Sequence, residues 1–342
     1  MNNEEKYQFD LNGYLHVKGL LDADAVARCL AAADRMEERV ASTIGDEPHF
    51  IGHFGVRYHY DQQFGTCSYQ ISHTGGRQYV VDDFLNADPV FDVFVNHAPT
   101  MAYVRELTMG PIRINSSELR YRHRGNFTGT HMGGPIDARN EFRFVGARML
   151  DADSRIAWRD FEMLNVRVLY ALHDLPEENG PLCVVPGSHK ANFQSPYGVD
   201  PRKEPGMVVL PMKAGDALFF TENLRHGGFP NVLEKVRKTV HLCFAPAWVA
   251  SQSPAHWNGL VHVTDAAWRR YDEAQRALLP PPSSWREHGF NPEMSDSVLQ
   301  TVQRLQQEVA KLSEENTRLH SRLSAWKAVL GPLRRLLRRL TG

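Results

Sequence analysis

Alternating apolar and polar positions characterise the middle of the chain. Between residues 112 and 250, short runs rich in β-branched and aromatic residues are separated by Gly, Pro, Asn and Asp. The runs are SELRYRHR, NVRVLYAL, PLCVVPGS, MVVLPM, DALFF and VRKTVHLCF. Closely spaced runs of this kind are typical of β-strands. They predict a mainly β domain, built as a sandwich or a barrel.

A strand and a helix are expected before this β region. GYLHVKGL predicts a short strand, and in DADAVARCLAAADRM the apolar residues recur at helical spacing behind Asp22, a suitable N-cap. Residues 38–110 are rich in aromatics and histidine and show no clear period. Residues 251–293, with many Pro, Trp and Ser residues, predict a segment that wraps around the domain and leads into a linker.

The clearest period is a heptad repeat near the C-terminus. One apolar series occupies the d positions, and a second, interrupted by Asn316, occupies the a positions. The d series is Val298, Leu305, Leu312, Leu319, Trp326, Leu333 and Leu340, and the a series is Val302, Val309, Asn316, Leu323, Leu330 and Leu337. Val at a, Leu at d and a single Asn at a favour two parallel strands. We therefore expect a parallel homodimer through residues 298–330, with a single helix packed on its own domain as the alternative.

A helix-breaking pair divides the C-terminal region. Gly331-Pro332 should break or kink the helix, because Pro lacks the backbone N–H that continues it. The following LRRLLRRL is basic and amphipathic, which suits either peripheral contact with an anionic membrane or a solvated end. We therefore predict a β domain at residues 1–290, a coiled-coil helix at 291–330 and a basic tail at 331–342.

Composition narrows the class of protein. The four cysteines form no CxxC pair, which fits reduced thiols in a cytosol, and no apolar run is long enough to span a membrane. With no signal-like N-terminus either, we expect a cytoplasmic location. The net charge of −1 gives no preference for nucleic acid. The sequence also lacks the glycine-rich nucleotide motifs and the GxSxG motif, so nucleotide binding and serine hydrolysis find no support.

Two of the sixteen histidines stand where a metal ligand is expected. His131 lies in the glycine-dense GNFTGTHMGGP, and His226 ends the strand-and-turn segment GDALFFTENLRHGG. Arg237 follows eleven residues later, and a returning strand would place it beside His226 in one sheet. Iron(II) that activates O2 needs few protein ligands, and neutral imidazoles suit it. An arginine fork in turn suits the far carboxylate of 2-oxoglutarate, whose keto acid end chelates iron.

These segments resemble a known family. GYLHVKGLL, NGPLCVVPGSHK, AGDALFF and the spacing of His226 and Arg237 are together similar to the phytanoyl-CoA dioxygenase family of iron(II) and 2-oxoglutarate oxygenases, over residues 9–250. The resemblance implies a double-stranded β-helix, or jelly roll, with flanking helices. It also implies that His131 and His226 bind the metal, that Arg237 anchors 2-oxoglutarate, and that His189 of PGSH is structural.

The co-substrate pocket of the family also draws on the strand in MLNVRVLYALHDL. Asn165 or Arg167 of that strand is therefore a candidate for binding 2-oxoglutarate, with an ordinary polar surface as the alternative. Thr239 shares a strand face with Arg237 and is a third candidate, because side chains two residues apart on a strand point the same way.

The metal motif departs from the family pattern of His, any residue, Asp. Here it reads His131-Met132-Gly133, a His-x-Gly variant without a carboxylate. In one interpretation Gly133 leaves room for chloride, and the enzyme is a halogenase. In another, water or a carboxylate such as Asp137 or Glu141 fills the gap, and the enzyme hydroxylates an unactivated C–H bond of a small-molecule or glycan-pathway substrate. In a third, iron binding is lost and the chain is a coiled-coil scaffold with an oxygenase-like head. We favour hydroxylation.

Overall fold

A computed structural model describes most of the β domain. The described residues are 1–44, 50–51, 57–71, 75–108, 110–132, 149–150, 156–157, 161, 163–191, 195–249 and 261–282, with the single positions 311 and 318. The chain divides into two compact units, Met1–Phe290 and Asn291–Gly342. Apart from those two single positions, the coiled coil and basic tail expected in the second unit lie outside the described residues and stay predictions. Within the described ranges, no helix is long and apolar enough to cross a membrane.

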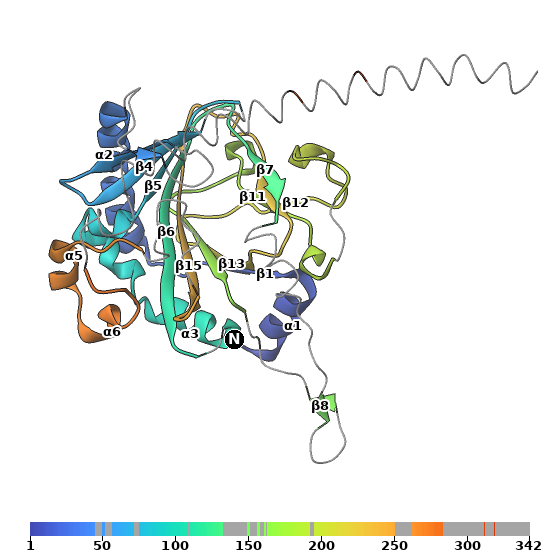
Figure 1. Ribbon diagram of the computed structural model, residues 1–342. Coiled ribbons are helices and arrows are strands. Elements are labelled where there is room, and N and C mark those ends of the chain that lie inside the picture. The colour runs from blue at the N-terminus through green and yellow to red at the C-terminus, as the bar shows by residue number, and fades with distance from the viewer. Residues whose placement is uncertain are drawn as a thin grey trace, which may run out of the picture. The chain divides into compact units, whose positions relative to one another are not determined.

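A nine-stranded antiparallel sheet forms the centre of the first unit (Figure 1). In order across the sheet, its strands are β1 (Tyr14–Val17), β13 (Ala217–Thr221), β10 (Val166–Ala171), β15 (Arg237–Pro246), β6 (Ile112–Arg122), β5 (Gln78–Asp82), β4 (Thr66–Ile71), β3 (Arg57–Asp61) and β2 (Phe50–Ile51). The two longest, β6 and β15, pair along almost their whole length. Because side chains alternate along each strand, this sheet has an inner and an outer face with different contents.

A smaller sheet lies against the inner face of the large one. Its strands are β12 (Val208–Val209), β11 (Leu182–Val184), β14 (His226–Gly228) and β7 (Thr128–His131). One apolar cluster contains residues of both sheets, namely Leu169, Ala171, Leu175, Leu182, Val184, Leu210, Met212, Leu218, Phe220 and Leu224. A core shared by two antiparallel sheets is the double-stranded β-helix that the resemblance implied, and that fold prediction is confirmed. A separate two-stranded pair joins β8 (Met149–Leu150) to β9 (Ile156–Ala157).

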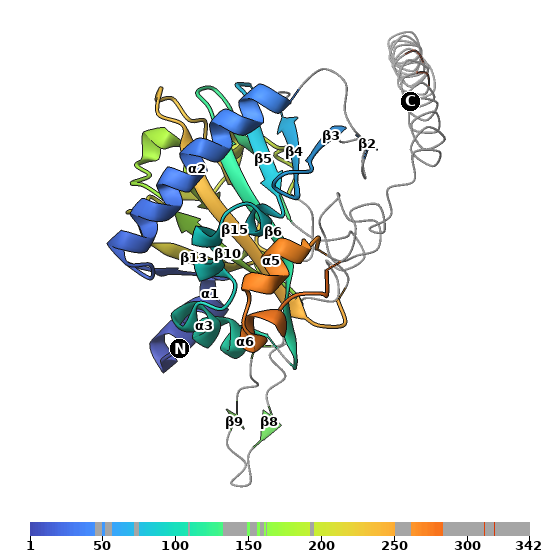
Figure 2. The same ribbon diagram turned by 90° about the vertical axis from the view of Figure 1, so that its left-hand side faces the viewer.

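Helices cover the outer face of the large sheet (Figure 2). They are α2 (Ala23–Thr43), α3 (Ala98–Leu107), α5 (Asp265–Arg270) and α6 (Glu273–Arg276), while α1 (Asn3–Asn12) lies beside β1 at the edge of the sheet (Figure 1). Short 3-10 segments lie at η2 (Phe84–Asn86), η3 (Pro89–Phe94), η4 (Glu177–Asn179), η5 (Ser188–Lys190) and η6 (Pro201–Lys203). The expected cap of α2 is confirmed, since the Asp22 carboxylate accepts a hydrogen bond from the Ala25 N–H at 2.7 Å. The second and larger apolar core lies between these helices and the sheet.

The strands expected from the alternating runs are all present, but one consequence drawn from them is wrong. His226 and Arg237 do not lie on neighbouring strands of one sheet, because β14 belongs to the small sheet and β15 to the large one. Residues 229–236 between them cross from one sheet to the other, which a simple hairpin would not do. The two residues therefore approach the interior of the jelly roll from opposite walls.

Candidate metal and co-substrate site

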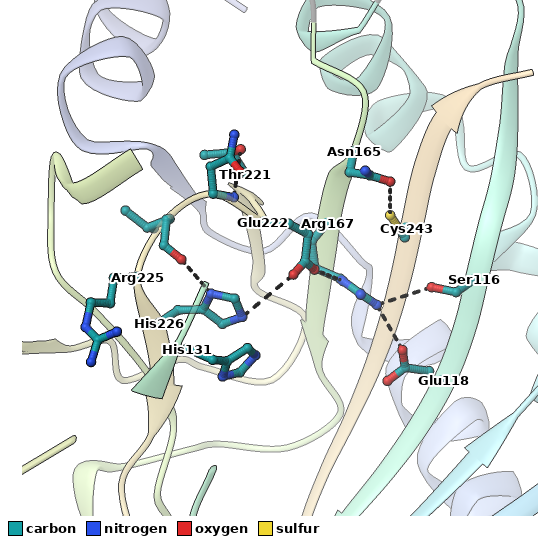
Figure 3. A network of polar contacts seen from close by, with 12 residues as sticks. Ser116, Glu118, His131, Asn165, Arg167, Thr221, Glu222, Arg225, His226 and Cys243 are labelled. Carbon is teal, nitrogen blue, oxygen red and sulfur yellow. Dashed lines mark hydrogen bonds and ion pairs between the residues drawn. The ribbon is translucent and has the colours of Figure 1, made fainter. Parts of the chain in front are cut away.

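The two candidate metal ligands are brought together across the small sheet. His131 ends β7, His226 begins β14, and the two residues are direct cross-strand partners. Their ring centroids lie 4.3 Å apart, with the rings tilted by 53° (Figure 3). The register shifts between His226 and Gly228, an irregularity of the kind that a β-bulge produces. Bulges redirect side chains next to functional sites, which suits a strand that must aim an imidazole inward.

Backbone hydrogen bonds define the tautomer of both imidazoles. Nδ1 of His131 donates to the carbonyl oxygen of Gly129, and Nδ1 of His226 donates to that of Leu224, each at 2.7 Å. A neutral imidazole carries one N–H, so the Nε2 atom of each ring is left with a lone pair. Metal-binding histidines in proteins are held in this way, with the far nitrogen donating to a carbonyl or carboxylate.

Both imidazoles are kept neutral by their surroundings. Burial, and then the neighbouring His131, lower the pKa of His226 to about 3. Burial also lowers the pKa of His131, although part of its ring is open to solvent, because the protein packed around the rest of the ring displaces water. A metal ion binds only unprotonated imidazole. The pair is therefore ready to bind a metal at neutral pH without first losing a proton.

The vacant carboxylate position of the motif, Gly133, lies outside the described residues, as do Asp137 and Glu141. Within the described part of the chain, no three His, Cys, Asp or Glu side chains are already grouped as a metal site. Among the described residues, an acidic group that lies close to the pair is Glu222, whose Oε2 is 3.9 Å from Nε2 of His226. This residue was not predicted from the sequence. Its one signal is its position four residues before His226, directly after β13.

The buried Glu222 carboxylate is ionised. Burial alone would raise its pKa, but Arg167, followed by His226, lowers that pKa to about 2. Nε of Arg167 donates to Oε1 of Glu222 at 2.5 Å, and Nη1 of Arg167 lies 3.1 Å from Glu118 and 3.3 Å from Ser116. The Arg167 guanidinium therefore joins two buried carboxylates on the inner face of the large sheet (Figure 3).

The three further candidates for 2-oxoglutarate binding all lie on or beside this inner face, and each is already bonded to protein. Arg167 is held by its carboxylates as described, and the Asn165 amide oxygen accepts a hydrogen bond from the Cys243 thiol at 3.3 Å. The Thr239 hydroxyl lies 3.0 Å from Nε2 of His241. Their role toward the co-substrate stays a prediction.

Arg237 differs from the other inner-face arginines. Its side chain is 3% exposed, and within the described part of the chain its guanidinium makes no hydrogen bond or ion pair. Burial, and then the charge of Arg120, lower its pKa to about 9. A buried charge without a partner is costly, so such a group is expected to meet an anion. Its planar fork matches a carboxylate.

The neighbouring Arg122, in contrast, has a structural role. Arg122 is the direct cross-strand partner of Arg237, but its Nη1 donates to the carbonyl of Gly180 at 3.0 Å and its Nη2 to the Thr128 hydroxyl. A side chain at Gly228 would collide with the Arg122 guanidinium, so this glycine is needed for the link. Arg122 thus ties the large sheet to the small one, whereas Arg237 has no such partner among the described residues.

His189 of the PGSH segment ties the turn after β11 to the first helix. It is buried, and its Nε2 donates to the carbonyl of Asp10 in α1 at 3.1 Å. The adjacent Gly187 N–H donates to the carbonyl of Asn12 at 3.0 Å. The turn after β11 is thereby tied to the first helix, as expected of a structural residue.

This histidine should make stability depend on pH. Burial, and then Lys190, lower the pKa of His189 to about 4, against roughly 6.5 in an unfolded chain. Between these values the unfolded state binds more protons, so folding stability should fall as pH drops from about 6.5 to about 4, by roughly 3 kcal/mol at most. Urea unfolding at several pH values should show a shallower pH slope for His189→Gln, which keeps an N–H donor. Equal slopes would rule out this contribution.

Comparisons with known proteins bear on the resemblance. Residues 141–239 match the family model described as Phytanoyl-CoA dioxygenase (PhyH). Over these residues, the resemblance to the phytanoyl-CoA dioxygenase family is confirmed. The matched segment includes His226 and Arg237 and begins after His131, so the family model covers one of the two candidate metal ligands.

Individual relatives agree with the family match. Over 83 residues the chain is 32% identical to Dioxygenase trt7 of Aspergillus terreus, a match that takes in 24% of this chain and 28% of that protein. The chain thus spans less than a third of the curated relative. HygX from Streptomyces hygroscopicus, solved with nickel, 2-oxoglutarate and hygromycin B bound, is 20% identical with a TM-score of 0.52, covering 72% of this chain and 88% of that one. The iron-bound form of HygX has the same identity and coverage and a TM-score of 0.50. The likeness to HygX shows a shared fold.

Proposed function

We propose that this protein is an iron(II)- and 2-oxoglutarate-dependent dioxygenase that hydroxylates an unactivated C–H bond of a small-molecule or glycan-pathway substrate. The observation that carries the proposal is Arg237, a buried guanidinium without a partner in the described chain, on the inner face of a jelly roll whose facing sheet holds two neutral histidines. The family match and the shared fold support the same class of enzyme.

Each residue has a distinct role in this proposal. Nε2 of His131 and Nε2 of His226 are the metal-binding atoms, because the other ring nitrogens are committed to backbone carbonyls. Arg237 holds the far carboxylate of 2-oxoglutarate and orients its keto acid end toward the histidines. When bound, iron(II) and 2-oxoglutarate supply the oxidation of a C–H bond by O2, with 2-oxoglutarate converted to succinate and CO2.

The proposal can be tested without knowing the substrate. Anaerobic addition of iron(II) and 2-oxoglutarate should produce the metal-to-ligand charge-transfer band of a chelated keto acid, and admission of O2 should yield succinate. Calorimetry with iron(II) alone provides an independent measure of metal binding. A protein that shows neither metal binding nor the band is not an enzyme of this class.

Halogenation is the second candidate, and Gly133 is the observation that favours it, because the motif supplies no carboxylate where the family has Asp. Gly133→Asp separates the two reactions. A hydroxylase with another source of the missing ligand should tolerate the substitution and keep forming succinate and hydroxylated product. A halogenase should lose chlorinated product in Gly133→Asp when native and variant are compared in chloride by mass spectrometry.

We also propose that the chain forms a parallel homodimer through residues 298–330. The support is the heptad pattern, with Asn316 the single polar a position. Light scattering should give a dimer mass for the full chain and a monomer mass for a chain that ends at residue 290. Monomer masses for both would refute the proposal, and a dimer without the heptads would place the contact in the β domain.

A further inference from the structure

The histidine pair and Glu222 present three acceptor atoms that carry no hydrogen: two imidazole nitrogens and one carboxylate oxygen. Nε2 of His131 and Nε2 of His226 each carry a lone pair, because the protons are on Nδ1. The Glu222 carboxylate faces the same space, with Oε2 3.9 Å from Nε2 of His226 (Figure 3). That separation is too long for a hydrogen bond, even if the imidazole were protonated at Nε2. Electron-rich atoms that lie this close to one another are stabilised by a cation among them.

The two oxygens of Glu222 have separate surroundings. Oε1 accepts a hydrogen bond from Nε of Arg167 at 2.5 Å, and Arg167 is braced from its other side by Glu118 at 3.1 Å. Oε2 makes no hydrogen bond to the described residues, and the side chain is 9% exposed. One oxygen is therefore used to hold the carboxylate in place, while the other is left to face the imidazoles.

We propose that Glu222 is the carboxylate ligand of the metal centre, binding through Oε2 beside His131 and His226 in the role that Gly133 cannot fill. This inference rests on the proposed metal-dependent function and decides between its two reactions. A carboxylate at this position takes the coordination site that a halogenase would leave for chloride. The centre then has two histidines and one carboxylate, the ligand set of non-haem iron oxygenases, with its carboxylate drawn from a different strand end.

The separation of the donor atoms is compatible with one ion. Nitrogen and carboxylate donors lie about 2.0–2.2 Å from a bound metal such as zinc, so two donors on one ion can be up to roughly 4.2 Å apart. The 3.9 Å between Oε2 and Nε2 falls at the wide end of this span. No compact three-residue site exists among the described side chains before binding, so the metal is expected to draw the Glu222 carboxylate toward the imidazoles.

The test uses cobalt(II) as the probe and compares the native protein with Glu222→Gln. Calorimetry should show cobalt affinity at least about 100-fold weaker in the variant, because loss of a partner in the outer shell alone costs about 10- to 100-fold. Glu118→Gln is the matched control. Glu118 is an equally buried partner of Arg167 that does not face the histidines, so its loss should weaken cobalt binding by no more than the roughly 10- to 100-fold cost of an outer-shell partner. Circular dichroism melting checks that each variant is folded.

A chloride titration of the cobalt protein provides a second readout, independent of metal affinity. With 2-oxoglutarate present, the visible spectrum of the native protein should not respond to chloride, whereas that of Glu222→Gln should. A native spectrum that responds to chloride, or equal cobalt affinities in native protein and Glu222→Gln, overturns the assignment of Glu222 and leaves the metal-dependent function standing. A native protein that binds no cobalt and no iron overturns both.

Discussion

Replacing Arg237 by leucine is expected to weaken 2-oxoglutarate binding by about 30-fold to several thousand-fold, since removing one partner of a buried charge pair costs about 2–5 kcal/mol. In the absence of 2-oxoglutarate, the same substitution should stabilise the fold by roughly 1 kcal/mol or more. This gain would appear as a rise of a few degrees in the melting temperature. Both effects have one cause. Arg237 is only 3% exposed, and its guanidinium has no partner among the described residues. The free-energy cost of burying this charge is therefore offset only when an anion binds.

Opposite signs for function and stability distinguish a binding residue from a structural one. Lys238→Met is the matched control, because Lys238 is the next residue of β15 and points to the outer face, where its Nζ lies 2.7 Å from Glu37. That variant should keep its affinity for 2-oxoglutarate. Isothermal titration and thermal melting on the same samples provide both readouts. If Arg237→Leu melts at a lower temperature and binds 2-oxoglutarate as before, Arg237 belongs to the framework of the fold.

Local sequence patterns were sufficient to predict the strands around the site and helix α2. The runs that became β10, β13 and β15 alternate or are continuously apolar, and Asp22 caps α2 as its position predicted. Residues 38–110 gave no such signal, yet they form β3, β4 and β5. The reason is visible in β5, where all five residues are buried. A strand covered on both faces has no exposed positions to mark its period.

Only those features of the candidate site that depend on residues close together in the sequence could be predicted. The spacing of His226 and Arg237 was informative, but their placement on opposite sheets depends on where the chain crosses the jelly roll, which no local period encodes. Glu222 was missed for a related reason. It is one of forty acidic residues, and its meaning comes from Arg167 and His226, which the fold brings to it.

Substituting either histidine of the pair should abolish stoichiometric metal binding. His131→Ala and His226→Ala each remove one of two imidazoles whose tautomers are fixed for ligation, and a site with one histidine fewer no longer competes with solvent for the ion. Because the two residues are direct cross-strand partners on short strands, we expect equal losses for the two variants. Iron or cobalt content after dialysis, measured by mass spectrometry, is the readout.

The control for this loss is another buried histidine. In His173, Nδ1 donates to the carbonyl of Asp174 at 2.8 Å and Nε2 accepts from the N–H of Lys238 at 3.1 Å, so the ring has no lone pair directed at an open space. His173→Gln should therefore keep its metal even if it lowers the melting temperature. Metal retained in His226→Ala but lost in His173→Gln would move the centre away from the small sheet. Metal lost in both histidine-pair variants, with Arg237→Leu still loaded, would show that the metal and the co-substrate carboxylate are held by separate walls of the jelly roll.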